Sequence, residues 1–263
     1  MDSIVERRGE GPAYETLAKV PLMHAGRIKP LDTLAREEVK QIFGRETIKL
    51  HDSANKVVAT WTPVAALFDW SSRPEFWDDQ AFLLVEYLPL KRLLLAETIE
   101  TRLTAIADKP ETAPADRDAL KALAARKEAL TAGDLNAFLG TSRVTGPDRA
   151  AVASLAGALS EEHRWLSPRE LEQARVLIDG QRLDFNTWFR GLVQRKRKAD
   201  GGMGAGTGPK LTDLEKRAIE AGTRLVHYQA LRERAIQQAI KLVLRVSLTE
   251  VEGEQFRVKL RTE

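Results

Sequence analysis

The strongest constraint in this sequence is a concentration of aromatic side chains between Phe43 and Tyr87. These 45 positions hold half of the Trp, Tyr and Phe residues of the chain. Large aromatic side chains dominate the energetics of a core because each buries a large apolar area. We therefore predict a compact aromatic-rich module within residues 1–107. Its aromatic members are Phe43, Trp61, Phe68, Trp70, Phe76, Trp77, Phe82 and Tyr87.

Composition places the chain among ordinary globular proteins. Hydrophobic residues make up 43% and charged residues 30% of the 263 residues. The net charge, 41 − 38 = +3, is too small for the whole molecule to be a polyanion binder, so any such contact must rest on a local patch. The absence of cysteine excludes disulfides, thiolate metal sites, iron–sulfur clusters and thiol catalysis.

No segment of the sequence is expected to cross a membrane. A spanning helix needs about 20 apolar residues. The most apolar stretch, residues 81–99, is interrupted by Glu86, Lys91, Arg92 and Glu97. Residues 1–15 lack the apolar run of a signal peptide.

Several elements are predicted in the first module. Apolar residues at spacings of three and four predict a helix from Pro30 to Phe43, ended by Gly44. Two β-prone runs, 47–51 and 56–60, predict a hairpin. A short helix is expected from Pro63 to Phe68.

The segment 108–200 is predicted to be mainly helical. We expect a peripheral helix over residues 115–130. A capping box, Ser167 with Glu170, predicts a helix from there to about Ile178. Phe185, Trp188, Phe189 and Leu192 form one apolar face and predict a helix over residues 184–198 that docks on another part of the protein.

The last part of the chain divides in two. Residues 201–209 contain five glycines and are expected to form a loop. Within residues 210–263, a capping box of Thr212 and Glu215 opens a long amphipathic helix to about Ile240. Alternation over residues 244–261 then predicts a β-hairpin. The predicted fold is therefore α+β and mainly helical.

The sequence offers no clear catalytic or metal site. The four histidines lack a partner at a recognised ligand spacing, so we assign no metal ligand and no catalytic residue. Asp78 and Asp79 could act as acid–base groups, but solvated acids at a helix start explain them better. The glycine-rich loop lacks the Lys-Ser/Thr of a phosphate-binding motif, because Leu211 follows Lys210.

A basic cluster at the end of the 184–198 helix has two interpretations. Its members could bind anionic lipid headgroups or, less readily, nucleic acid, since no aromatic residue for base stacking lies among them. Alternatively, they are cations that complement the negative end of the helix dipole. The cluster comprises Arg190, Arg195, Lys196, Arg197 and Lys198.

One segment, GRIKPLDTLAR from Gly26 to Arg36, carries both a structural and a family interpretation. Gly26 permits a tight turn, Pro30 opens the helix, and Arg27 could hydrogen-bond a carboxylate such as Asp32. The string resembles a segment of CcsA/ResC-like (System II) cytochrome c biogenesis proteins, as do PEFWDDQAFLLVEYLPLKRLL and WLSPREL. The motif residues are Gly26, Arg27, Lys29, Pro30, Leu31, Asp32 and Thr33.

The resemblance implies an extracytoplasmic (periplasmic) domain, tethered to the membrane by segments absent from this chain. It implies membrane-embedded cytochrome c assembly subunits, apocytochrome c and anionic lipid as partners, and no nucleic acid. Haem belongs to the full-length system. The tryptophan-rich haem-handling loop of the family has no counterpart here, because Trp70 is followed by Ser71 and the tryptophans are dispersed, so no haem ligand is carried over.

Two other functions remain open. The long helix could form an intermolecular coiled coil in a cytoplasmic adaptor, or the basic run from Gln194 to Lys198 could bind nucleic acid weakly.

Overall fold

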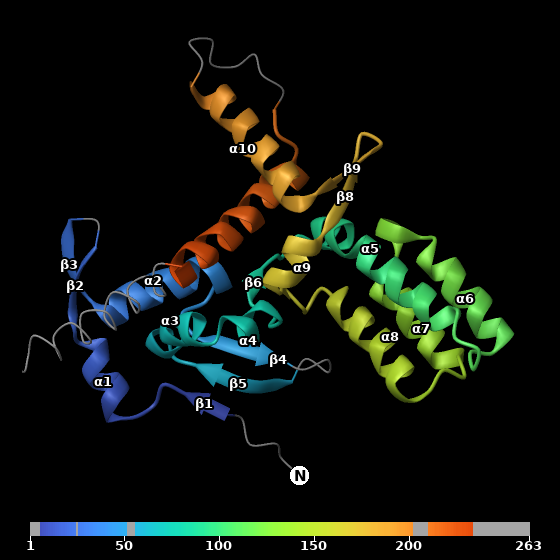
Figure 1. Cartoon of the computed structure of the whole chain (residues 1–263), viewed down its shortest axis with the longest axis horizontal. Helices are drawn as coiled ribbons and strands as arrows, with labels where there is room; N and C mark the ends of the chain where they lie inside the picture. Colours follow the sequence, from blue (N-terminus) through green and yellow to red (C-terminus); the bar gives the residue numbers. More distant parts are fainter. Residues whose placement is uncertain (1–5, 25, 52–55, 202–209, 234–263) are drawn as a thin grey trace, which may run out of the picture.

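The computed structural model describes residues 6–24, 26–51, 56–201 and 210–233. The fold is mainly helical with small sheets, as predicted (Figure 1). The expected continuation of the long helix beyond residue 233, the 244–261 hairpin and most of the glycine-rich loop lie outside the described residues. The domain boundaries at residues 107 and 200 stay predictions.

The first module contains a three-stranded sheet with the strand order β1 (Glu6–Arg8), β5 (Val57–Trp61), β4 (Ile48–His51). β4 and β5 are the predicted hairpin, paired antiparallel with an irregularity between Leu50 and His51. β1 pairs parallel to β5, a contact that the sequence pattern did not indicate.

The module's helices are α1 (Pro12–Ala18), α2 (Leu31–Phe43), α3 (Pro63–Ser72) and α4 (Pro74–Asp78). α2 confirms the prediction, and Gly44 ends it with a left-handed φ of 85°. α3 runs four residues past the expected end at Phe68.

Two of the tryptophans share one carboxylate. Asp69 accepts hydrogen bonds from Nε1 of Trp61 at 3.1 Å and from Nε1 of Trp77 at 2.9 Å, and Arg73 pairs with it. Trp77 and Trp70 are almost fully buried, with ring centroids 6.2 Å apart. The indole N–H groups of Trp61 and Trp77 are therefore satisfied within the core. This core continues into the second group of helices, whereas Phe68 and Phe76 are 45% and 37% exposed.

A second group of helices follows along the chain: α5 (Leu88–Ala107), α6 (Pro114–Ala124), the 3₁₀ turn η1 (Lys127–Ala129), α7 (Ala132–Thr141) and α8 (Gly146–Ala158). The helix expected over 115–130 is wrong in its second half. It ends at Ala124, since Lys127 has a φ of 47° that an α-helix cannot contain. Leu120 and Leu130 are both buried against the core.

A two-residue strand pair joins the two parts: β6 (Leu83–Leu84) pairs with β7 (Trp165–Leu166). The Trp165 ring stacks on Phe43 with centroids 4.9 Å apart, and its Nε1 donates to the Phe43 carbonyl at 3.0 Å. The segment that precedes α9 is thus fixed to the end of α2.

The predicted helix from Ser167 to Ile178 is correct at its start and wrong at its end. The capping box forms, but α9 (Pro168–Gln173) stops early. The chain then makes a hairpin of β8 (Arg175–Ile178) and β9 (Gln181–Asp184). Its turn places Asp179 and Gly180 at φ values of 50° and 77°.

α10 (Phe185–Gly201) confirms the amphipathic helix, with Phe185, Trp188 and Leu192 buried. A second helix covers residues 213–233, and its predicted capping box forms between Thr212 and Glu215. The two helices touch closely, since a Cβ built on Gly222 would lie 2.3 Å from Cδ2 of Phe189.

Candidate docking surface

The family-like segment folds into a surface hairpin followed at once by a helix. β2 (Pro21–His24) pairs antiparallel with β3 (Arg27–Pro30), and His24 lies opposite Arg27. Gly26 lies between the strands with a φ of 76°, the left-handed region that glycine tolerates best. The amide of Leu31 donates to the carbonyl of Val20 at 2.8 Å and closes the hairpin.

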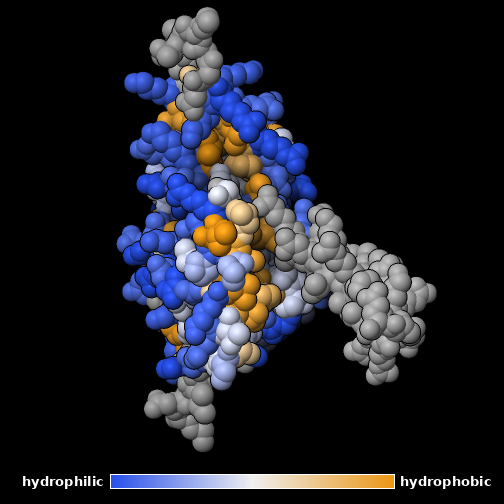
Figure 2. Space-filling model, turned by 90° about the vertical axis from the view of Figure 1, so that its left-hand side faces the viewer, coloured by the Kyte–Doolittle hydropathy of each residue, from blue (hydrophilic) through white to orange (hydrophobic). Residues whose placement is uncertain are grey.

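The outward face of this hairpin is apolar. Met23 and Ile28 are cross-strand partners, and each side chain is 71% exposed. Directly opposed residues project from the same side of a strand pair. Leu17 and Val20 are also partly exposed, at 37% and 38%. These four residues are called the hairpin surface below, and Figure 2 shows apolar side chains gathered on the face of the molecule to which the hairpin belongs.

Two of the other motif residues, Lys29 and Asp32, form ion pairs with residues of α2. Lys29 pairs with Glu37 of α2 at 2.7 Å, which ties β3 to the helix. Asp32, in the first turn of α2, accepts from Arg36 at 2.7 Å, so Arg36 is its partner and not the expected Arg27. Arg36 also bonds Glu46, and these carboxylates raise the pKa of its guanidinium.

The seven motif residues lie along one hairpin strand and the helix that follows it. Gly26 makes the turn, Arg27, Lys29 and Pro30 belong to β3, and the remaining three lie in the first turn of α2. Arg27 is exposed and has no hydrogen bond or ion pair with the described residues. The exposure of Met23 and Ile28 was missed by the sequence analysis, because a β-prone run that ends in Pro30 gives a weak strand signal.

The basic cluster lies elsewhere, on the outer half of α10. Figure 1 places this end of α10 and the β2–β3 hairpin at separate extremities of the molecule. Arg195 forms an ion pair with Glu215 of the neighbouring helix and so has a structural role. The other four members, Arg190, Lys196, Arg197 and Lys198, are exposed.

The 213–233 helix packs inside this chain. The apolar stripe predicted for it consists of Leu214, Ala218, Ala221, Leu225 and Tyr228. Leu214 is partly buried, and the other four are each at most 1% exposed. Arg224 donates to the carbonyls of Gln41 and Leu84. An intermolecular coiled coil through these residues would require the helix to leave the core.

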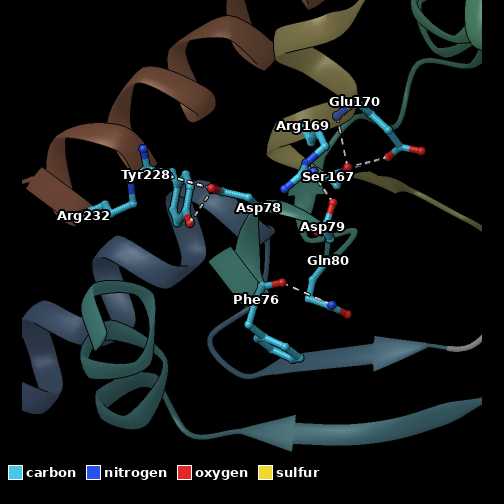
Figure 3. A network of polar contacts seen from close by, with 9 residues as sticks. All are labelled: Phe76, Asp78, Asp79, Gln80, Ser167, Arg169, Glu170, Tyr228 and Arg232. Atoms are coloured by element: carbon cyan, nitrogen blue, oxygen red, sulfur yellow. Dashed lines mark hydrogen bonds and ion pairs between the residues drawn. The ribbon is translucent and has the colours of Figure 1, made fainter. Parts of the chain in front are cut away.

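Asp78 and Asp79, at the end of α4, form ion pairs with the 213–233 helix and with α9 (Figure 3). Asp78 accepts from Arg232 at 2.7 Å and from the hydroxyl of Tyr228 at 3.4 Å. Asp79 pairs with Arg169 of α9 at 2.9 Å. Burial raises the pKa of Tyr228, which keeps its hydroxyl protonated as a donor. Both aspartates therefore serve structural pairs. The expected position at a helix start is wrong, because Asp78 is the last residue of α4 and Asp79 follows it.

Comparisons with known proteins add no relative: no family model, no curated protein and no solved structure matches this chain. Within the described residues, no helix is long and apolar enough to span a bilayer. In that same part of the chain, no cluster of three or more histidine or acidic side chains could hold a metal ion.

Proposed function

We propose that this chain is an extracytoplasmic domain of a membrane-bound, System II-like cytochrome c biogenesis protein and acts as a docking module. The observation that carries the proposal is the place of the family-like segment. Residues 26–33 contribute little to the core and instead present a surface hairpin whose outward face is apolar.

The exposed apolar pair supplies a physical reason for docking. Full burial of a Met or Ile side chain is worth about 1.5–3 kcal/mol, and the described fold leaves most of this unused at Met23 and Ile28. A partner that covers the hairpin surface would gain that free energy. The proposed partners are the membrane-embedded assembly subunits and apocytochrome c.

The basic end of α10 is the proposed lipid contact. Arg190, Lys196, Arg197 and Lys198 are exposed on one helix. Each such cation contributes roughly 1 kcal/mol near an anionic membrane surface. Haem chemistry is assigned to the rest of the apparatus, and this chain receives no haem ligand.

The proposal is tested by site-specific crosslinking in the full-length protein in its membrane. A photo-reactive amino acid at Ile28 should crosslink to membrane-embedded assembly subunits or apocytochrome c. The matched control is Leu177, an apolar residue of the other hairpin that is 56% exposed. Equal crosslinking from both positions, or none from Ile28, would contradict the proposal.

A second measurement addresses the activity of the whole system. Met23→Ser combined with Ile28→Ser should lower covalent haem attachment to cytochrome c several-fold while leaving the unfolding midpoint almost unchanged, because both residues are exposed. Leu177→Ser serves as the control and should leave haem attachment intact.

A further inference from the structure

A polar cavity of about 300 Å³ lies between the aromatic module and the second group of helices. Its walls come from β4, α5, α8 and α9 and from the segments before α5 and α9. This volume is at the small end of the range for ligand cavities. The cavity lies apart from the hairpin surface, with which it shares no residue.

Small side chains keep this space open. Gly157 and Ala158 at the end of α8 and Ala81 before β6 line it, and none of them can fill it. Thr98 and Arg102 also line the cavity and are four residues apart on α5, so they share one helix face. Polar side chains thus face a gap that larger residues would have closed.

A buried lysine fixes one wall. Lys91 is only 2% exposed, and its ammonium donates to the carbonyl of Ser160 at 3.1 Å and to that of His163. Burial lowers the pKa of Lys91 to about 8, whereas the charge of Glu170 acts in the opposite direction. The lysine is therefore a cation near neutral pH, held directly behind the cavity wall.

Two imidazoles line the cavity. The His51 ring lies 5.5 Å from that of Trp165 in a stacked arrangement, which sets its plane. Burial lowers the pKa of His163 to about 4, and the charges of Lys91 and His51 act in the same direction. Near neutral pH the His163 ring is uncharged and offers one donor and one acceptor.

The charges of the lining favour an anionic ligand. Asp79 is neutralised by its ion pair with Arg169. Glu170 accepts from the amide of Ser167 at 2.8 Å and from its hydroxyl at 3.0 Å (Figure 3). The charge of Glu170 is offset by the buried Lys91 cation, with which it interacts electrostatically. Arg102 has no hydrogen bond or ion pair with the described residues, so the charge of its guanidinium is not offset by a partner in the lining.

We propose that this cavity binds a small organic or inorganic oxyanion, with the Arg102 guanidinium on the anionic group and the His163 ring and nearby hydroxyls on its other polar atoms. Guanidinium groups bind carboxylate and phosphate oxygens through paired, charge-assisted hydrogen bonds. This inference is independent of the docking function, because it uses a different part of the molecule.

The test measures binding of citrate and of inorganic phosphate to the purified chain by isothermal titration calorimetry, at constant ionic strength set with chloride. At least one of the two anions should bind, and the one that binds identifies the ligand as carboxylate or phosphate. Arg102→Gln should weaken that binding at least tenfold. Arg149→Gln removes an exposed arginine of α8 that does not line the cavity and should leave binding unchanged.

A second variant separates a cavity site from a surface ion pair. Ser154 lies at the exposed edge of the cavity, so Ser154→Trp should obstruct the space while keeping Arg102 and the fold. Loss of binding in this variant supports the cavity site. Binding of neither anion, unchanged binding in Ser154→Trp, or equal losses in the two arginine variants would overturn the proposal.

Discussion

The β2–β3 hairpin with α2 and the β8–β9 hairpin with α10 are two hairpin–helix units of the same construction. In the first, Pro21 pairs with Pro30; in the second, Arg175 pairs with Asp184. The first helical residue donates its amide to the residue before the hairpin in both units, Leu31 to Val20 at 2.8 Å and Phe185 to Ala174 at 2.9 Å. Both turns contain a left-handed glycine.

The two units reach this geometry with different side chains. Asp184 caps α10, accepting from the amide of Thr187 at 2.8 Å and from its hydroxyl at 2.7 Å. Pro30 holds the corresponding position before α2 and provides no such cap. Pro30 instead has a fixed φ suited to the approach to a helix.

The units differ most in how they use apolar residues. Val176 in β8 is fully buried, and Arg182 in β9 pairs with Glu97 of α5. No residue of β2 or β3 is buried, and Met23 and Ile28 are each 71% exposed. The comparison teaches that a hairpin of this shape can be anchored in the core, so the lack of buried residues in β2 and β3 is not a requirement of the hairpin–helix construction.

The largest expected effect tests this difference directly. Val176→Asp should lower the free energy of unfolding by about 3–5 kcal/mol, since it places an unpaired charge in the core. Ile28→Asp should change it by no more than about 0.5 kcal/mol, because residue 28 faces solvent. Urea unfolding measures both, and a loss at Ile28 that matches the loss at Val176 would erase the distinction.

A smaller effect concerns the turns. Alanine at Gly180 or at Gly26 meets no atom within 4 Å, so its cost is the left-handed backbone alone, about 1 kcal/mol. Gly180→Ala should show this cost in global unfolding, because β8 is anchored in the core. Gly26→Ala should act locally, raising hydrogen exchange of the β2–β3 amides with little change in global stability. If Gly26→Ala lowered the free energy of global unfolding as much as Gly180→Ala does, the first hairpin would be as firmly anchored in the core as the second.

The smallest effect is a pH dependence of the second unit. Arg182 holds the pKa of Glu97 below its ordinary value. The pair therefore stabilises the protein above the ordinary carboxyl pKa of about 4.3 and loses this effect as the pH falls through the lowered value. Arg182→Gln should lower the melting temperature slightly near pH 7, and this difference should disappear as the pH falls through the lowered pKa of Glu97. Arg27→Gln, in the first unit, is the control. It should leave the melting temperature unchanged at both neutral and acidic pH.

Local sequence signals predicted the elements that depend on local chemistry. Gly44 and the capping boxes at Ser167 and Thr212 marked helix ends correctly, because these motifs act within one turn. The β8–β9 hairpin was missed although Asp179-Gly180 between apolar runs is a strong turn signal. The capping box predicted where α9 starts but carried no information on where it stops.

The remaining features depend on residues far apart in the chain. Pairing of β1 with β5 joins Glu6 to Ala59, and three residues give no periodic pattern. The candidate sites were only partly predictable for the same reason. The motif residues are contiguous, but the cavity assembles His51, Arg102 and His163 from three separate segments.

The aromatic core has a consequence for spectroscopy. Tyr228 of the 213–233 helix lies edge-on to Trp70 and Phe82, with ring centroids 5.7 Å and 5.0 Å apart. Rings held rigidly at such angles give strong circular dichroism in the near ultraviolet. The near-ultraviolet circular dichroism of the native protein therefore reports whether this helix is packed on the core. Its detachment can be followed by the loss of that signal, without an added dye.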